Sequence, residues 1–201
     1  MTIINCYCAL VQNRNVQRRL YSAELEIPVP KVIIMGAFWY TNLVDKGAEH
    51  MCRQTTPNQT RKDKIPDYTN IFDMEKMIIP MFINKCHWTC CCINFSDKKF
   101  EYYDSLHWEA TAVFSNMEKY IITELTVKNG YDKATCELEL EQWIPEKQTG
   151  YPTQANDKDC GVYTLKCIEW ISENMFIGYD DKDMLYFRKR ILCDIVKSSI
   201  S

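Results

Sequence analysis

The architecture of this chain is set by one segment, His87-Trp88-Thr89-Cys90-Cys91-Cys92-Ile93-Asn94-Phe95-Ser96-Asp97-Lys98-Lys99-Phe100-Glu101-Tyr102-Tyr103-Asp104. Residues 88–95 form a short apolar run, three turn-forming residues follow, and residues 99–104 form a second run rich in aromatic side chains. This order predicts two strands joined as a β-hairpin. Because a hairpin returns its second strand beside the first, we expect the imidazole of His87 and the carboxylate of Asp104 to meet.

The rest of the chain predicts a mixed α+β domain with helices around this hairpin. Apolar side chains at helical spacing predict helices over residues 3–13, 38–47, 109–124, 160–170 and 184–196. Further strands are expected over 77–83 and over 136–143, where apolar and acidic residues alternate as in a half-buried strand. Residues 53–64 are polar and read as an exposed loop. With no repeat or linker, we expect one domain over residues 1–201.

The composition excludes several classes of protein. Hydrophobic residues make up 46% of the 201, aromatic residues 12%, and only 7 Pro and 6 Gly are present, which argues against disorder. The longest uncharged apolar run, residues 32–40, is about half of the ~20 residues that a membrane span needs. The N-terminus lacks the features of a secretory signal, so we expect an intracellular protein. A net charge of −3 argues against a nucleic-acid partner.

The 11 cysteines are best explained as reduced thiols. Their number is odd, and a chain of this length can bury a core without disulfides. A zinc site is not expected, because there is no Cys-x-x-Cys pair and the side chains of Cys90, Cys91 and Cys92 would alternate between the two faces of a strand.

One cysteine stands in a different setting from the others. Cys160 follows the polar loop 156–159 and opens an apolar-periodic helix, with Gly161 leaving the backbone accessible. A thiol at a helix N-terminus has a lowered pKa, because the helix dipole and the free backbone N–H groups stabilise the thiolate. Cys160 is therefore the candidate nucleophile, and the alternative is a buried structural thiol.

The other catalytic roles can be assigned to residues elsewhere in the sequence. Of the three histidines, His87 opens a strand at the edge of a cleft and is the candidate base, and Asp104 would orient it. Gln154 precedes the nucleophile by six residues and could donate to an oxyanion. Each residue also has a purely structural interpretation. His87 could be an ordinary histidine at a strand edge, Asp104 could simply end the hairpin, and Gln154 could be a solvated loop residue. The remaining histidines, in a loop-like region and after a turn, are His50 and His107.

Four short motifs stand in the order and approximate spacing of a known family: His87-Trp88, Tyr103-Asp104-Ser105, Pro152-Thr153-Gln154 and Asp159-Cys160-Gly161-Val162-Tyr163. At these residues the chain resembles the Ulp/SENP cysteine proteases, which process the small ubiquitin-like modifier SUMO. Three further segments resemble the family's first helix, aromatic second segment and last helix: Thr2–Asn5, Phe38–Leu43 and Phe187–Ile191.

The resemblance implies a papain-like fold, with a central mixed sheet flanked by helices, and a protease that cuts after the Gly-Gly tail of SUMO. Cys160 would attack the carbonyl, His87 would transfer the proton, Asp104 would orient the imidazole and Gln154 would hold the oxyanion. Trp88 would wall the narrow tunnel for the tail, although as a single residue it could equally belong to the core. Such an enzyme matures precursors and strips conjugates, needs no cofactor, and is expected to act as a monomer in the nucleus or cytoplasm.

The chain departs from the family at its start. The family has a Trp-Leu-Asn-Asp motif immediately before the helix that matches Thr2–Asn5, whereas this chain begins at Met1. Either the sequence is truncated there or the enzyme is impaired. Two alternatives therefore stay open, a protease for another modifier such as NEDD8 or ubiquitin, and a catalytically weak SUMO-binding module. The basic run Arg188-Lys189-Arg190 reads as the solvated face of a helix, and we assign it no function.

Overall fold

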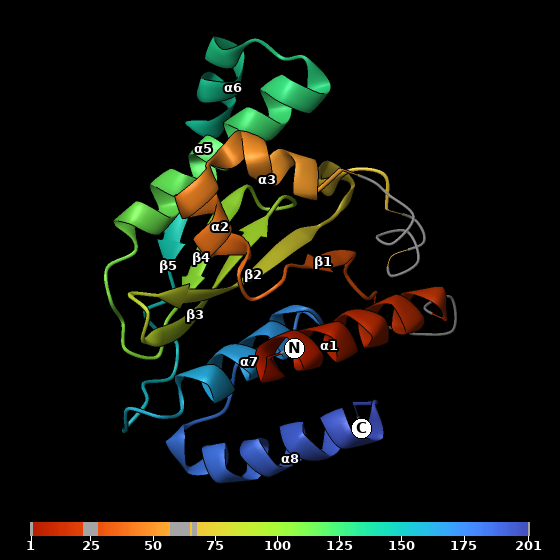
Figure 1. Cartoon of the computed structure of the whole chain (residues 1–201), viewed down its shortest axis with the longest axis vertical. Coiled ribbons are helices and arrows are strands. Elements are labelled where there is room, and N and C mark those ends of the chain that lie inside the picture. The colour runs from red at the N-terminus through yellow and green to blue at the C-terminus, as the bar shows by residue number, and fades with distance from the viewer. Residues whose placement is uncertain (1, 22–27, 57–64, 66–67, 201) are drawn as a thin grey trace.

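A computed structural model of the chain describes residues 2–21, 28–56, 65 and 68–200, which fold around a five-stranded sheet with helices on both faces (Figure 1). The strands lie in the order of the chain: β1 (Val32–Ile34), β2 (Lys76–Ile83), β3 (His87–Asn94), β4 (Lys99–Tyr103) and β5 (Ile144–Lys147). The two outer pairs are parallel and the two inner pairs are antiparallel. The expected mixed sheet is confirmed.

The predicted hairpin is formed by β3 and β4, with Cys90 opposite Tyr103 and Asn94 opposite Lys99. The side chain of Asn94 stabilises the turn, because its Oδ1 accepts from the backbone N–H of Asp97 at 3.1 Å and its Nδ2 donates to the Asp97 carboxylate at 2.9 Å. His87 pairs with Ile83 across the preceding hairpin and so starts β3 at the edge of the β2–β3 turn.

The helices form one layer on each face of the sheet (Figure 1). One layer contains α2 (Trp39–Lys46), α3 (Ala48–Gln54) and α5 (Thr111–Asn129), and the other contains α1 (Ile3–Leu20), α7 (Cys160–Ile171) and α8 (Met184–Lys197). The 3-10 helices η2 (Ile71–Asp73) and η3 (Asp181–Asp183) precede β2 and α8. Among the described helices, none has the length and apolar character that crossing a bilayer requires.

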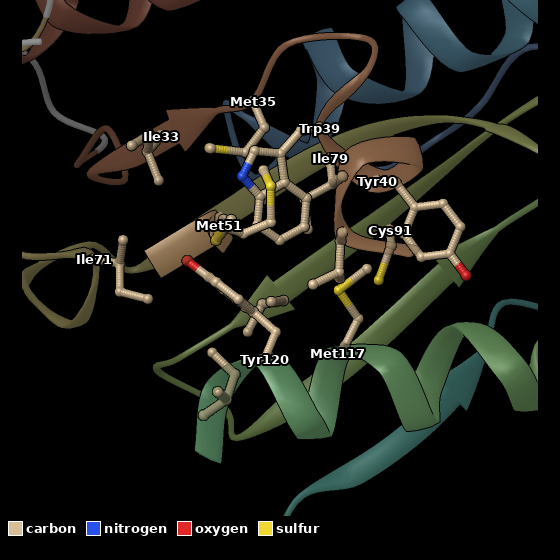
Figure 2. Packing of buried hydrophobic residues seen from close by; sticks show 14 of the residues in the cluster. Ile33, Met35, Trp39, Tyr40, Met51, Ile71, Ile79, Cys91, Met117 and Tyr120 are labelled. Carbon is tan, nitrogen blue, oxygen red and sulfur yellow. The ribbon is translucent and has the colours of Figure 1, made fainter. Parts of the chain in front are cut away.

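The three consecutive cysteines of β3 show why both layers are needed. Cys91 faces the core under α2, α3 and α5, whereas Cys90 and Cys92 face the core under α1 and α7, and all three are fully buried. Strands covered on both faces are apolar at every position rather than at alternate ones. Figure 2 shows the core under α2, α3 and α5, in which Trp39 of α2 contacts Tyr120 of α5 edge to face at 4.8 Å between ring centroids.

The strand predicted over residues 136–143 is wrong, because the structure has helix α6 (Lys133–Leu140) there and β5 only from Ile144. The carboxylate of Asp132 caps the helix by accepting from the backbone N–H groups of Ala134 and Thr135 at 3.0 and 3.1 Å. Only Cys136 and Leu140 are buried, four residues apart on one helical face, whereas Leu138 is 62% exposed. The alternation of apolar and acidic residues was therefore misleading.

The other predicted elements are found, with some changes of length. The first helix continues to Leu20, well beyond residue 13, and the second ends before Gly47, whose φ of 82° is readily adopted by glycine. The short helix α3 was not predicted and includes the first two residues of the expected loop 53–64, of which residues 57–64 lie outside the described part. The predicted strand 77–83 and the predicted helices 109–124, 160–170 and 184–196 agree with β2, α5, α7 and α8.

Candidate active site

Three elements bring a thiol, an imidazole and a carboxylate together at one end of the sheet. His87 is the first residue of β3, Asp104 directly follows β4, and Cys160 is the first residue of α7, which packs against β3. The Nε2 atom of His87 lies 2.6 Å from Oδ1 of Asp104, and both side chains are almost completely buried. The predicted meeting of these two groups is confirmed.

The Asp104 carboxylate is held by the chain that follows it. Its Oδ1 also accepts from the backbone N–H of Leu106 at 2.8 Å, and its Oδ2 accepts from the backbone N–H of Trp108 at 2.9 Å and from the Tyr102 hydroxyl at 3.2 Å. Burial raises the pKa of Asp104, but the hydrogen bonds from His87 and the backbone lower it further than burial raises it. The carboxylate therefore stays ionised and fixed in orientation.

The His87 imidazole is placed to hold a proton between this carboxylate and the thiol. Because Nε2 faces Asp104, Nδ1 is the ring nitrogen left to interact with Cys160. Burial lowers the pKa of His87, but hydrogen bonds with Asp104 and Cys160 raise it, with a net result of about 9. The imidazole is therefore protonated near neutral pH.

The neighbours of the Cys160 thiol favour its thiolate form. Burial raises its pKa, but the hydrogen bond with His87 and the backbone N–H groups of Trp88 and Gly161 lower it, so that the net pKa lies below that of an ordinary thiol. A lowered thiol pKa next to a raised imidazole pKa favours a thiolate–imidazolium pair. Such a pair can attack a carbonyl carbon and then protonate the leaving group.

Gln154 lies beside this group in the loop before α7, and its side chain is buried and held at both ends. Its Oε1 accepts from the Ser105 hydroxyl at 2.6 Å, and its Nε2 donates to the carbonyl oxygen of Asn156 at 2.5 Å. Its backbone N–H also donates to the Ser105 carbonyl at 3.0 Å. The amide is thus tied to the residue after Asp104, and a side-chain NH2 group has a second hydrogen for another acceptor.

Trp88 borders the nucleophile. Its indole lies 4.8 Å from the Phe82 ring between centroids, and its Cδ1 would lie 3.7 Å from a Cβ atom placed on Gly161. The methyl group of Ile4 lies on the same side at 3.8 Å from that position. Trp88 is only partly buried and packs against the core under α1 and α7.

Trp108 is a residue that the sequence interpretation missed. Its indole lies 4.8 Å from the His87 ring between centroids, at an interplanar angle of 50°. An aromatic residue four positions after Asp104 was a possible signal, but its contact depends on a tight turn in which His107 has a φ of 55°. His107 itself is directed to Thr153, whose hydroxyl oxygen lies 2.8 Å from its Nε2.

Similar proteins are found by sequence and by fold. A family model described as "Ulp1 protease family, C-terminal catalytic domain" matches residues 1–200. A Sentrin-specific protease of Caenorhabditis elegans is 30% identical over 198 residues, which are 98% of this chain and 25% of that protein. Ubiquitin-like-specific protease 1 of Saccharomyces cerevisiae is 25% identical over 171 residues, which are 83% of this chain and 24% of that protein. The chain thus spans about a quarter of the length of these relatives.

Solved structures give the same fold. The C-terminal Ulp1 protease domain in complex with Smt3, the yeast ortholog of SUMO, matches with a TM-score of 0.71 at 22% identity, over 99% of this chain and 76% of that one. The SUMO protease Ulp1 with its catalytic cysteine oxidised to a sulfonic acid matches with a TM-score of 0.73 at 22% identity, over 99% and 78%. The expected fold, a mixed sheet flanked by helices as in the Ulp1 domain, is confirmed.

Proposed function

Since this chain belongs to the Ulp1 protease family, we propose that it is a cysteine protease that cleaves after the C-terminal Gly-Gly of SUMO, both in precursors and in lysine isopeptide conjugates. The observation that carries the proposal is the buried His87–Asp104 pair at 2.6 Å, with the Cys160 thiol hydrogen-bonded to the same imidazole. A protease for SUMO acts inside cells, in the nucleus or cytoplasm, and the domain over residues 1–201 is proposed to act as a monomer.

The reaction follows from the positions of these groups. The Cys160 thiolate attacks the carbonyl carbon of the second glycine, and the negative charge moves to the carbonyl oxygen. Gln154 and the backbone N–H of Cys160 are the proposed donors to that oxyanion. When the C–N bond breaks, His87 gives its proton to the leaving amine, and a thioester remains on Cys160.

Water then completes the cycle. His87, now neutral, takes a proton from a water molecule that attacks the thioester, and the Cys160 thiolate is released together with the Gly-Gly carboxylic acid, which loses its remaining proton to solvent. Asp104 keeps the imidazole in one orientation through both steps. The proposed steps use side-chain and backbone groups of this chain together with water, and they require no cofactor.

Trp88 is the proposed wall of the path for the Gly-Gly tail. Its indole packs on the first turn of α7, directly beside the nucleophile, and leaves part of its ring exposed. Residues without side chains fit closely between an aromatic ring and a backbone, and this supports selection for glycine at the cleavage site.

A probe with an electrophile at the C-terminus of SUMO tests the proposal. We expect the purified chain to form a covalent adduct with the SUMO probe, and the Cys160→Ala variant to form none. Parallel probes made from NEDD8 and ubiquitin test the first alternative, and labelling by either of them in preference to SUMO would assign the enzyme to that modifier. SUMO binding without any adduct in the unmodified chain would instead favour the binding module.

A further inference from the structure

The turn that leads into α7 is held by a residue almost thirty positions further along the chain. Arg188 of α8 donates from Nε to Oδ1 of Asp159 at 2.6 Å, and a second guanidinium nitrogen contacts the same oxygen. That nitrogen also donates to the carbonyl oxygen of Lys158 at 2.6 Å. One guanidinium therefore joins two successive residues immediately before Cys160.

The second oxygen of Asp159 is also taken. Asn156 donates from Nδ2 to Oδ2 of Asp159 at 2.6 Å, and its own Oδ1 accepts from the backbone N–H groups of Lys158 and Asp159 at 2.8 and 3.1 Å. The Asp159 side chain is thus fixed between α8 and its own loop, and the residue is only 8% exposed.

In this arrangement the Asp159 side chain does not cap helix α7, although Asp159 stands at the cap position. Asp159 is the N-cap residue of α7, and an aspartate there usually accepts from the backbone N–H groups two or three residues ahead. In this helix it makes no side-chain cap hydrogen bond, and the N–H groups of Val162 and Tyr163 bond to its backbone carbonyl instead. The backbone N–H of Gly161 is hydrogen-bonded to the Cys160 sulfur and lowers the pKa of that thiol.

We propose that Arg188 is a positioning residue for the reaction, because it holds the Asp159 carboxylate away from the N-terminus of α7 and keeps the Gly161 N–H for the Cys160 thiolate. The inference rests on the proposed role of Cys160 as the nucleophile. Asp159 has a φ of −95° and a ψ of −5°, whereas a capping residue is usually extended. Without Arg188, the backbone and carboxylate of Asp159 are free to turn together into the cap position, where the negative charge would compete with the thiolate for the same donor.

Among the described residues, few charged groups lie around the Cys160 thiol, so the effect of Arg188 on this thiol can be isolated. His87 faces it from β3 with Asp104 behind, and Lys158 and Asp159 precede it in the turn. Arg188 approaches from α8, and α1 contributes the uncharged Ile4.

The test compares Arg188→Ala with Lys189→Ala, which removes an equal charge from the neighbouring exposed position of α8. The first readout is the pH dependence of Cys160 alkylation by iodoacetamide, followed on the Cys160 peptide by mass spectrometry. We expect Arg188→Ala to raise the midpoint by about one pH unit and to lower kcat on a SUMO-derived substrate about tenfold, with KM changed less than about twofold. Lys189→Ala should leave both unchanged.

A second substitution separates positioning from general stability. Adding Asp159→Ala to Arg188→Ala removes the competing acceptor together with its charge and should return the alkylation midpoint to that of the parent, which a loss of folding stability would not do. Arg188→Lys keeps the charge and should restore part of kcat. If Arg188→Ala does not fold, as judged by its melting temperature, Arg188→Gln takes its place with the same expected direction.

The inference is wrong if Arg188→Ala keeps the parent's alkylation midpoint, or if adding Asp159→Ala to Arg188→Ala fails to restore it. Alkylation needs no modifier, so this outcome is independent of the SUMO probe. A chain that shows the expected midpoint shift but never labels with a SUMO probe would overturn the proposed substrate and leave the role of Arg188 intact.

Discussion

The indole of Trp108 lies against the imidazole of His87 with 4.8 Å between ring centroids, while the backbone N–H of the same tryptophan donates to the Asp104 carboxylate at 2.9 Å. One residue therefore contacts both members of the proposed acid–base pair. Its ring shields the imidazole on one side, and its backbone fixes the carboxylate that orients the imidazole.

Removing the Trp108 ring should weaken catalysis without removing any catalytic group. A cation over an aromatic ring is stabilised by about 0.5–2 kcal/mol, so Trp108→Ala should lower kcat/KM by about twofold to thirtyfold and lower the pKa of His87. The backbone contact to Asp104 is kept. Trp108→Phe should retain most of the activity, and His107→Ala serves as a neighbouring control. Full activity of Trp108→Ala at all pH values would show that the ring has no part in holding the imidazolium.

The pH dependence of turnover should have two limbs. As the pH falls through the lowered pKa of Cys160, the thiolate gains a proton and turnover is lost. As the pH rises through about 9, His87 loses the proton that it gives to the leaving amine, and turnover is lost again. The measurement is kcat/KM against pH with a SUMO-derived fluorogenic substrate.

Alkylation of Cys160 separates these two limbs. It depends on the thiolate alone, so it should decline only on the acidic side and persist above pH 9. His87→Ala should move its midpoint upward, toward that of an ordinary thiol. An unchanged midpoint in that variant would mean that the imidazole does not stabilise the thiolate.

Gln154 should matter to kcat more than to KM. Removal of one side-chain donor to an oxyanion lowers kcat by about 10²–10³-fold, and we expect Gln154→Ala to fall in this range. Ser105→Ala removes the hydroxyl that donates to Oε1 of Gln154 at 2.6 Å, so it should give a smaller loss in the same direction. Gln154→Ala with parental kcat would remove Gln154 from the mechanism.

Helix α6 can be tested through its cap. Asp132→Ala removes the acceptor for the N–H groups of Ala134 and Thr135 and should lower the free energy of unfolding by about 0.5–2 kcal/mol, measured by urea denaturation. Leu138→Glu should be nearly neutral, because that side chain is 62% exposed. A large loss from Leu138→Glu would favour the strand that the alternation first suggested.

The sequence could predict those parts of the site that depend on local structure. His87 and Asp104 belong to one hairpin, and its register, with Tyr103 opposite Cys90, brings Asp104 close to His87. Cys160 is marked by the change from a polar loop to an apolar helix. Trp108 and Arg188 could not be assigned in this way. The first depends on the backbone of a single tight turn, and the second on how α8 packs against a loop far from it in the chain.

The wrong prediction for residues 136–143 has a similar cause. Alternating apolar and acidic residues are compatible with either a strand or a short helix that buries a single stripe, and the choice depends on Asp132, which lies outside the alternating segment. Local pattern alone does not contain that information.

The proposed catalytic group is divided between two layers of the molecule. The sheet carries His87 and Asp104, whereas Cys160 belongs to α7 in the layer with α1 and α8. During partial denaturation, detachment of that layer would separate sulfur from imidazole while the hairpin is still paired. Proteolytic activity should therefore be a more sensitive reporter of this one interface than any spectroscopic measure of total strand content.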